Sequence, residues 1–271
     1  MKWDRTARVV ERLTSRGQIS GSGTTRRYNN RHIIGRDSSI DGGVYLGAYQ
    51  REAIVVDFFN SPMLKLNFES AKLEISSQSL RPELDSLNAV YKAVHRAMMY
   101  DHNTVEELVR KYSVKKDGEI SLNVFADRGV GVCRHMALTC GVIVEKLIEE
   151  GVMEGRVSVD RKTMKQEGHA WCRYTGPDGA VFIIDVAQQY CGKLSSPSVI
   201  RAYSRPVEEF AMTPEEAYEH YLEYYETTGM PCRLLPALSE LSRPSTASYN
   251  YNEIAGRVTG EAPKETSALA I

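Results

Sequence analysis

The stretch from Gly129 to Gly151, GVGVCRHMALTCGVIVEKLIEEG, constrains the fold of this chain more than any other segment. Its apolar residues recur at the spacing of a helix with one buried face. They are Met136, Cys140, Ile143 or Val144, and Leu147. Gly151 stands where a glycine commonly ends a helix. The sequence therefore predicts a long amphipathic helix with Cys133 in or just before its first turn.

The position of Cys133 permits two interpretations. Cysteine is among the most buried residue types, so packing alone explains many cysteines. However, Gly129 and Gly131 allow close backbone approach just before it, and the first turn of a helix stabilises a thiolate through unpaired N–H groups and the helix dipole. This second interpretation makes Cys133 a candidate nucleophile.

The other polar residues of this helix are expected to be structural. Cys140 lies two turns further along the apolar face and is predicted to belong to the core. His135 points elsewhere around the helix, where a surface or capping role is common. Cys133, His135 and Cys140 lack any recognised metal-ligand spacing, so no metal site is expected.

A predicted hairpin follows. The runs HAWCRY and AVFIIDVA flank TGPDG, a strong turn signal. An antiparallel hairpin centred on Pro177 would place His169 directly opposite Asp185, close enough for a hydrogen bond. A slip of one residue would move Asp185 to the other face of the sheet. In the predicted register, Asp185 orients His169, and His169 faces a thiol, as in nucleophile–base–carboxylate triads.

The remaining elements are read from periodicity. Residues 44–76 contain four β-rich runs, VYLGAY, AIVVDFF, LKLNFE and KLEIS, and are predicted to form strands. A helix is predicted to begin at Pro82 and to end near Tyr100. A second helix follows, with Thr104 and Glu107 able to form a capping box.

The two ends of the chain differ from its middle. Residues 1–35 are predicted to be a basic, flexible segment, because the first 31 residues hold eight Lys and Arg against two acidic residues, and SGSGTTRRYNNR is typical of a linker. Residues 36–240 form the predicted domain. Residues 241–271 lack periodicity and are predicted to be disordered.

Composition excludes several classes of protein. The net charge is −1, so no nucleic acid or membrane partner is expected. The five cysteines include no C-x-x-C pair, and the charged start of the chain lacks the apolar core of a secretory signal. A cytoplasmic protein with reduced thiols is the simplest interpretation.

At this point the motifs resemble a known family. The segments GVGVCRHMALTCGVIVEKLIEEGV, GHAWCRY and VFIIDVAQ, in this order, look like the transglutaminase-like core, a branch of the papain-like cysteine-enzyme fold. The resemblance covers residues 82–190 and does not explain residues 44–76 or either end. It implies an α+β domain in which a Cys-bearing helix packs on an antiparallel sheet.

The resemblance also implies a chemistry. Cys133 would be the nucleophile, His169 the general base and acid, and Asp185 the residue that holds the imidazole. Papain-like proteases place a Gln six residues before the cysteine as an oxyanion donor, but this chain has Asp127 there. Tyr100 or Asn123 is the candidate donor in its place, beside the backbone N–H of Cys133. The reaction needs no cofactor.

Three functions remain open on sequence alone. The first is a cysteine hydrolase, a protease or an amidase, that acts on a protein or peptide substrate through a thioester. The second is a transglutaminase-type acyltransferase that passes the acyl group to an amine. The third is a non-catalytic scaffold that binds partners in the same cleft. Given an intact triad, the hydrolase is favoured. The scaffold is weakened because it has no physical need for Cys, His and Asp together.

Overall fold

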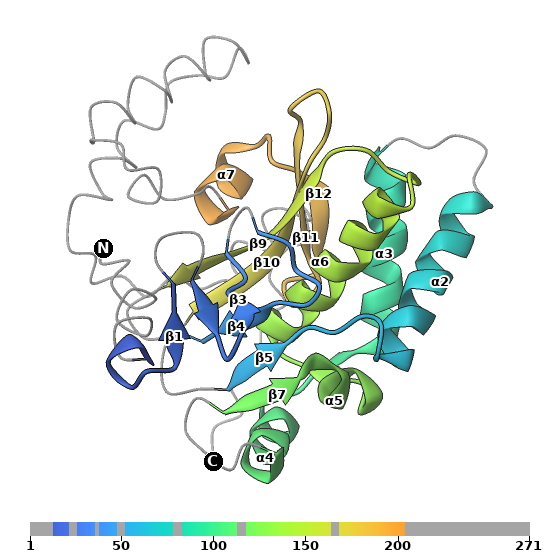
Figure 1. Ribbon diagram of the computed structural model, residues 1–271. Helices are drawn as coiled ribbons and strands as arrows, with labels where there is room; N and C mark the ends of the chain where they lie inside the picture. The colour runs from blue at the N-terminus through green and yellow to red at the C-terminus, as the bar shows by residue number, and fades with distance from the viewer. Residues whose placement is uncertain are drawn as a thin grey trace, which may run out of the picture. The chain divides into compact units, whose positions relative to one another are not determined.

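The computed structural model describes residues 13–21, 26–35, 38–47, 52–77, 83–112, 118–163 and 168–203 (Figure 1). By internal contacts the chain divides into one unit, Lys2–Leu194, and a second formed by Met1 with Ser195–Ile271. The second unit includes α7 (Pro197–Tyr203). The domain limits of 36 and 240 stay a prediction, and the tail at 241–271 lies outside the described residues.

A four-stranded antiparallel sheet contains the predicted hairpin. Its strand order is β12-β11-β10-β9. The strands are β9 (Arg156–Thr163), β10 (Gly168–Thr175), β11 (Val181–Asp185) and β12 (Tyr190–Lys193). The hairpin itself joins β10 to β11, as the turn signal predicted.

The register of this hairpin differs from the predicted one. Thr175 pairs with Val181, and Cys172 with Ile184, so the turn is centred on Asp178 rather than on Pro177. The reason is local: the N–H of Gly176 donates to the carbonyl of Ala180 at 2.8 Å, and Gly179 takes a left-handed φ of +83°. Each partner shifts by two residues, which leaves every side chain on its predicted face.

The helix α6 (Cys133–Glu149) packs against this sheet. It contacts β9, β10 and β11 on one side and α3 (Glu83–Ala97) on the other (Figure 1). All the residues of its predicted apolar face are buried: Met136, Cys140, Ile143, Val144 and Leu147. The predicted α+β class, with a Cys-bearing helix on an antiparallel sheet, is therefore confirmed.

The strand prediction for residues 62–76 is wrong. This segment forms α2 (Pro62–Ser76), which lies beside α3 and α6 (Figure 1). The run LKLNFE alternates like a strand, but the buried residues Leu64, Phe68, Ala71 and Ile75 follow helical spacing. Leu66 is 59% exposed and Leu73 is 73% exposed, because they lie on the outer face. Pro62 occupies the first turn of this helix, where proline is tolerated.

The other two β-rich runs do form strands. They are β4 (Val44–Leu46) and β5 (Ala53–Val55), which pair antiparallel, and β5 also pairs in parallel with β7 (Glu119–Ser121). The short helix α5 (Leu122–Asp127) follows β7 directly, and the Ser121 side chain caps it by accepting the N–H of Asn123.

The helices before the cysteine need two corrections. The helix that was predicted to end near Tyr100 is α3 and ends at Ala97, and Met99–Tyr100 form the two-residue strand β6. The next helix, α4 (His102–Tyr112), is capped by Asp101 rather than Thr104. The Asp101 carboxylate accepts the N–H of Asn103 and of Thr104, and the Thr104 hydroxyl donates to it as well.

Part of the N-terminal segment is folded, so the prediction of a flexible linker is wrong there. Three two-residue strands, β1 (Ile19–Ser20), β2 (Arg27–Tyr28) and β3 (Arg31–His32), form an antiparallel sheet. Leu13 and Tyr28 are buried in a cluster with residues of β4 and β5. Leu13, Tyr28 and Ile19 of the same cluster therefore anchor this segment. Residues 1–12 lie outside the described part of the chain.

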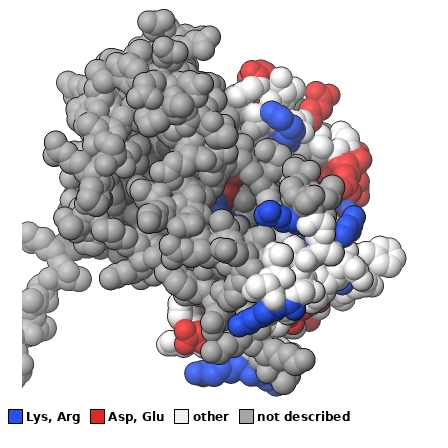
Figure 2. Space-filling model, turned by 60° about the vertical axis from the view of Figure 1, so that its left-hand side comes forward, with Lys and Arg blue, Asp and Glu red and all other residues white. Residues whose placement is uncertain are grey.

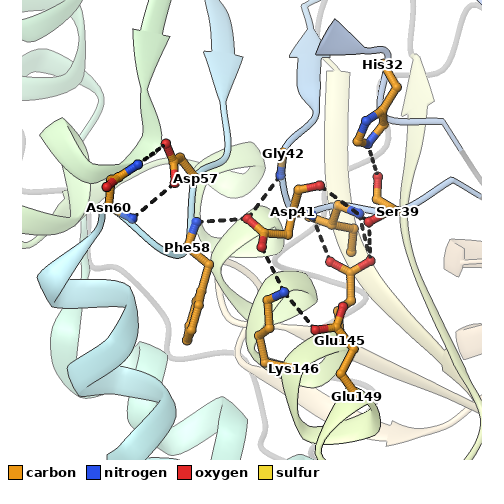
Figure 3. Close-up of polar contacts among 11 residues, drawn as sticks. His32, Ser39, Asp41, Gly42, Asp57, Phe58, Asn60, Glu145, Lys146 and Glu149 are labelled. Carbon is orange, nitrogen blue, oxygen red and sulfur yellow. Dashed lines mark hydrogen bonds and ion pairs between the residues drawn. The ribbon is translucent and has the colours of Figure 1, made fainter.

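A polar network joins the loop before β4 to α6 (Figure 3). Glu145 accepts the N–H groups of Ile40 and Asp41 at 2.8 and 2.7 Å. Asp41 in turn accepts the N–H of Phe58 at 2.8 Å and pairs with Lys146 at 2.8 Å. Because Lys146 and Glu145 are neighbours on α6, the network fixes the loop against the helix that carries Cys133.

Within the described ranges, no helix has both the length and the apolar character needed to cross a membrane. On the face in Figure 2, the described Lys and Arg side chains are interspersed with Asp and Glu rather than gathered in one patch.

Candidate active site

Cys133 is the first residue of α6, as the sequence predicted. The strand β8 (Val130–Gly131) runs up to it and pairs in parallel with β6. Gly129 takes a left-handed φ of +62°, and a Cβ on Gly131 would lie 2.7 Å from Cε of Met98. The glycines before the cysteine thus provide a sharp turn and a close approach that larger residues resist.

His169 and Asp185 lie within hydrogen-bonding distance. Nε2 of His169 is 2.5 Å from Oδ2 of Asp185. The hairpin register, continued by one pair, places Asp185 opposite Trp171, so His169 reaches it diagonally. The His169 side chain is 11% exposed, and that of Asp185 is 1% exposed. The structure therefore brings together the two residues that the predicted hairpin paired.

Cys133 meets the same histidine. Sγ of Cys133 lies 3.9 Å from the carbonyl oxygen of Gly168, the first residue of β10. A hydrogen bond joins the Cys133 and His169 side chains, and the N–H of Ala170 also interacts with the thiolate. Because Nε2 of His169 faces Asp185, Nδ1 is the nitrogen left for the thiol. Three residues from α6, β10 and β11 thus form one polar chain.

The electrostatics of this chain favour an ion pair. Burial by itself raises the pKa of the Cys133 thiol, but the hydrogen bond and positive charge of His169, with smaller effects from Ala170 and Arg134, hold it below its ordinary value. Burial likewise lowers the pKa of His169, but Asp185 and the thiolate overcome this and raise it to about 10. The contacts around the two side chains therefore favour a thiolate beside an imidazolium.

The surroundings fix the His–Asp pair. The indole of Trp171 stacks on the His169 ring, with 5.8 Å between centroids and 29° between planes. The second oxygen of Asp185 accepts the backbone N–H of Gln188 at 3.0 Å. Gln189, next along this turn, takes a left-handed φ of +54°, which is uncommon outside glycine. These contacts limit how far the carboxylate and the imidazole can rotate.

The two oxyanion candidates differ in their surroundings. Tyr100 lies on β6, opposite Gly131, and is 54% exposed. Asn123 lies on α5, where its amide nitrogen donates to Asp127 at 2.8 Å and its amide oxygen accepts the Ser61 hydroxyl. These bonds commit Asn123 to the junction of α2 and α5. Tyr100, on the strand that pairs with β8 just before Cys133, stays a candidate donor.

Sequence reasoning missed Glu52 and misplaced His135. Glu52, 3% exposed, precedes β5 and forms an ion pair with Arg134, whose Nε donates to it at 2.6 Å. His135 is fully buried rather than on the surface, and its Nδ1 accepts the N–H of Val132, so the capping interpretation is the correct one. A lone Glu before a short apolar run has no pattern that marks it, and its partner is 82 residues away.

The other described cysteines lack these features. Cys140 and Cys172 are buried in the core, as predicted for Cys140, and burial raises the pKa of both thiols well above the ordinary value. Burial raises the pKa of Cys191 to about 12. No group of three His, Cys, Asp or Glu residues in the described ranges is placed to hold a metal ion. Cys232 lies outside these ranges.

Comparison with known proteins adds little. No protein-family model and no curated protein matches this sequence. A solved structure described as "Crystal structure of a TGase" is similar to 46% of this chain, with 22% identity and a TM-score of 0.32. The match spans 30% of that structure's chain. At this level of similarity, fold and activity have to be argued from the chain's own residues.

Proposed function

We propose that this protein is a cysteine-dependent acyl-transfer enzyme that acts as a hydrolase, a protease or an amidase, on protein or peptide substrates. The observation that carries the proposal is the unbroken chain from the Cys133 thiol through His169 to Asp185. A low-pKa thiol at a helix start, beside a histidine held by a carboxylate, is the arrangement that nucleophilic catalysis requires. The order of the motifs, similar to the transglutaminase-like core, supports the same proposal.

The first half-reaction forms a thioester. The Cys133 thiolate attacks the carbonyl carbon of the substrate amide, which forms a C–S bond and an oxyanion. When the intermediate collapses, the C–N bond breaks and the leaving nitrogen takes a proton from the His169 imidazolium. Asp185 holds the ring in place and stabilises its charged form. The amine departs, and the acyl group stays on sulfur.

The second half-reaction releases the acid. Neutral His169 accepts a proton from water as the water oxygen attacks the thioester carbonyl. The C–S bond then breaks, the carboxylic acid leaves, and the thiolate–imidazolium pair is restored. The Cys133 backbone N–H, which has no acceptor inside the helix, donates to the oxyanion in both steps, with Tyr100 as the proposed second donor.

The proposal is tested by trapping the acyl-enzyme. We expect p-nitrophenyl acetate, an activated ester, to acetylate the protein once, at Cys133, as read by intact mass and peptide mapping. Cys133→Ala removes this product, while the matched variant Cys191→Ala, which also replaces a half-buried cysteine, keeps it. Acetylation that persists in Cys133→Ala would refute the nucleophile. A non-catalytic scaffold predicts that Cys133 reacts no faster than a small free thiol.

A further inference from the structure

The buried carboxylate of Glu52 contacts the first turn of α6, the helix that begins at Cys133. Glu52 precedes β5 and is 3% exposed. One of its oxygens, Oε1, accepts Nε–H of Arg134 at 2.6 Å and also pairs with Nη2 of the same guanidinium. The same oxygen lies 3.6 Å from Nε2 of His135. Glu52 therefore meets both residues that follow the candidate nucleophile.

His135 extends this contact to the backbone before Cys133. Its Nδ1 accepts the N–H of Val132 at 3.2 Å, so in the neutral ring the proton lies on Nε2, on the side of Glu52. The ring also packs on Phe125, with centroids 4.0 Å apart. Through His135, Glu52 is connected to Val132, the residue before Cys133. Glu52 also contacts Arg134, the residue after Cys133.

We propose that Glu52 is a positioning residue for catalysis, which fixes the first turn of α6 so that the Cys133 thiol and its backbone N–H meet the substrate carbonyl together. This inference rests on the proposed role of Cys133. A buried carboxylate needs a paired cation, and the two-point contact of a guanidinium fixes direction as well as distance. Nucleophilic attack depends steeply on such placement.

The same cluster acts on the charge of the thiol. The charged groups that face Cys133 are His169 on β10 and Arg134 on α6, with Asp185 behind the first and Glu52 behind the second. Arg134 favours the thiolate, and Glu52 partly cancels that positive charge. Removing the negative charge of Glu52 should therefore favour the thiolate while it loosens the helix start. Loss of the Glu52 charge should thus favour thiolate formation but impair the placement of the thiol. A residue that only stabilised the fold would not produce these two opposite effects.

The test measures two reactions of the full chain. Alkylation by iodoacetamide across pH reports the thiolate, and acetylation by p-nitrophenyl acetate reports the placement of nucleophile and oxyanion donors. The acid limb is the rise of the alkylation rate with pH as the Cys133 thiol loses its proton. In Glu52→Gln we expect the midpoint of this acid limb to move down by roughly half a pH unit. We expect acetylation to slow by about tenfold. The control Glu69→Gln, an exposed acid on α2, should change neither.

Each result decides the inference. It is overturned if Glu52→Gln leaves both reactions at wild-type values, or if both fall only in proportion to the folded fraction. If Glu52→Gln does not fold, Arg134→Lys replaces it, since it keeps the charge but loses the two-point contact. Slower acetylation with an unchanged acid limb is then expected, and wild-type acetylation overturns the inference. A wild-type acid limb equal to that of a free thiol would overturn the proposed function itself, and this inference with it.

Discussion

Asp185 holds His169 from a diagonal position across β10 and β11, with 2.5 Å between Oδ2 and Nε2. Diagonal neighbours on one sheet face lie further apart than directly opposed residues, and long or aromatic side chains can span the gap. The imidazole therefore bridges β10 and β11 through Nε2, and Nδ1 is the nitrogen left for the thiol of Cys133. The site depends on this diagonal pairing, because one ring serves both the carboxylate and the thiol.

Replacement of the histidine and the aspartate should have unequal effects. His169→Ala removes the general acid and base, so we expect acetylation at Cys133 and later turnover to fall on the order of a thousandfold. Asp185→Asn keeps a group that can hold the ring but loses its charge, and we expect a loss roughly a hundredfold smaller than that of His169→Ala. Single-turnover rates with p-nitrophenyl acetate measure both. Equal losses in the two variants would contradict the supporting role of Asp185.

The raised pKa of His169 should make stability depend on pH. Its pKa is about 10 in the folded chain against an ordinary 6.5, so the folded state binds the proton more tightly than the unfolded state. The contribution to the free energy of unfolding is complete below about pH 6.5 and is lost as the pH rises toward 10. The thiolate acts in the opposite direction, since its lowered pKa gives stability that is lost as the pH falls.

The experiment therefore removes the thiol first. Urea unfolding of Cys133→Ala is compared with that of Cys133→Ala/His169→Gln at pH 6 and pH 9. Because Asp185 still raises the pKa of His169 in the first variant, the difference in unfolding free energy should be larger at pH 6. A difference that grows toward pH 9 would show that the histidine is held neutral.

The described cysteines should differ in reactivity. At pH 7, iodoacetamide should modify Cys133 at least about a hundredfold faster than Cys140, Cys172 or Cys191, whose thiol pKa values are raised by burial. Timed quenching and peptide mapping give the four rates. Denatured protein is the control, in which the four rates should converge. Faster labelling of Cys191 in the folded protein would remove the basis for Cys133 as nucleophile.

Gly129→Ala should damage the site more than an equally strained glycine elsewhere. Gly129 and Gly151 both have left-handed φ values, +62° and +70°, so alanine costs about 1 kcal/mol of conformational strain at either position. A Cβ on Gly129 would also lie 3.2 Å from the carbonyl oxygen of Ala97, whereas Gly151 faces open space. We expect both variants to lower the melting temperature, but only Gly129→Ala to slow alkylation of Cys133. Equal alkylation rates would show that the turn before α6 tolerates the change.

The core of the site was predictable because each part is local in sequence. The Cys133 helix, the strand start at His169 and the turn near Pro177 each have their own short signal. The predicted register was wrong by two residues, but a shift of two preserves the face of every side chain, so the contact between His169 and Asp185 was still predicted. The sequence therefore predicted the sheet face on which each side chain lies, but not its exact partner on the neighbouring strand.

The errors arose where distant contacts decide the structure. The run at residues 62–76 alternates like a strand, but packing of α2 against α3 and α6 selects the helix, whose buried face follows a different set of residues. Tyr28 looks like part of a linker until the cluster that buries it is known. Glu52 finds its partner Arg134 only in the folded chain, so no local pattern could mark it.

The final prediction concerns the acceptor of the acyl group. Once a thioester forms at Cys133, water and amines compete for it, and transfer to an amine requires that the amine be docked or that water be excluded. The sequence has no D-x-D-x-D-G calcium loop, and among the described elements no further β-domain adjoins the sheet that carries His169 and Asp185. Water should then win by concentration. We expect a glutamine-containing peptide, incubated with enzyme and excess labelled primary amine, to be deamidated or cleaved with at most a minor share of labelled product. Cys133→Ala gives the background for both products, and predominant amine incorporation above that background would instead establish a transferase.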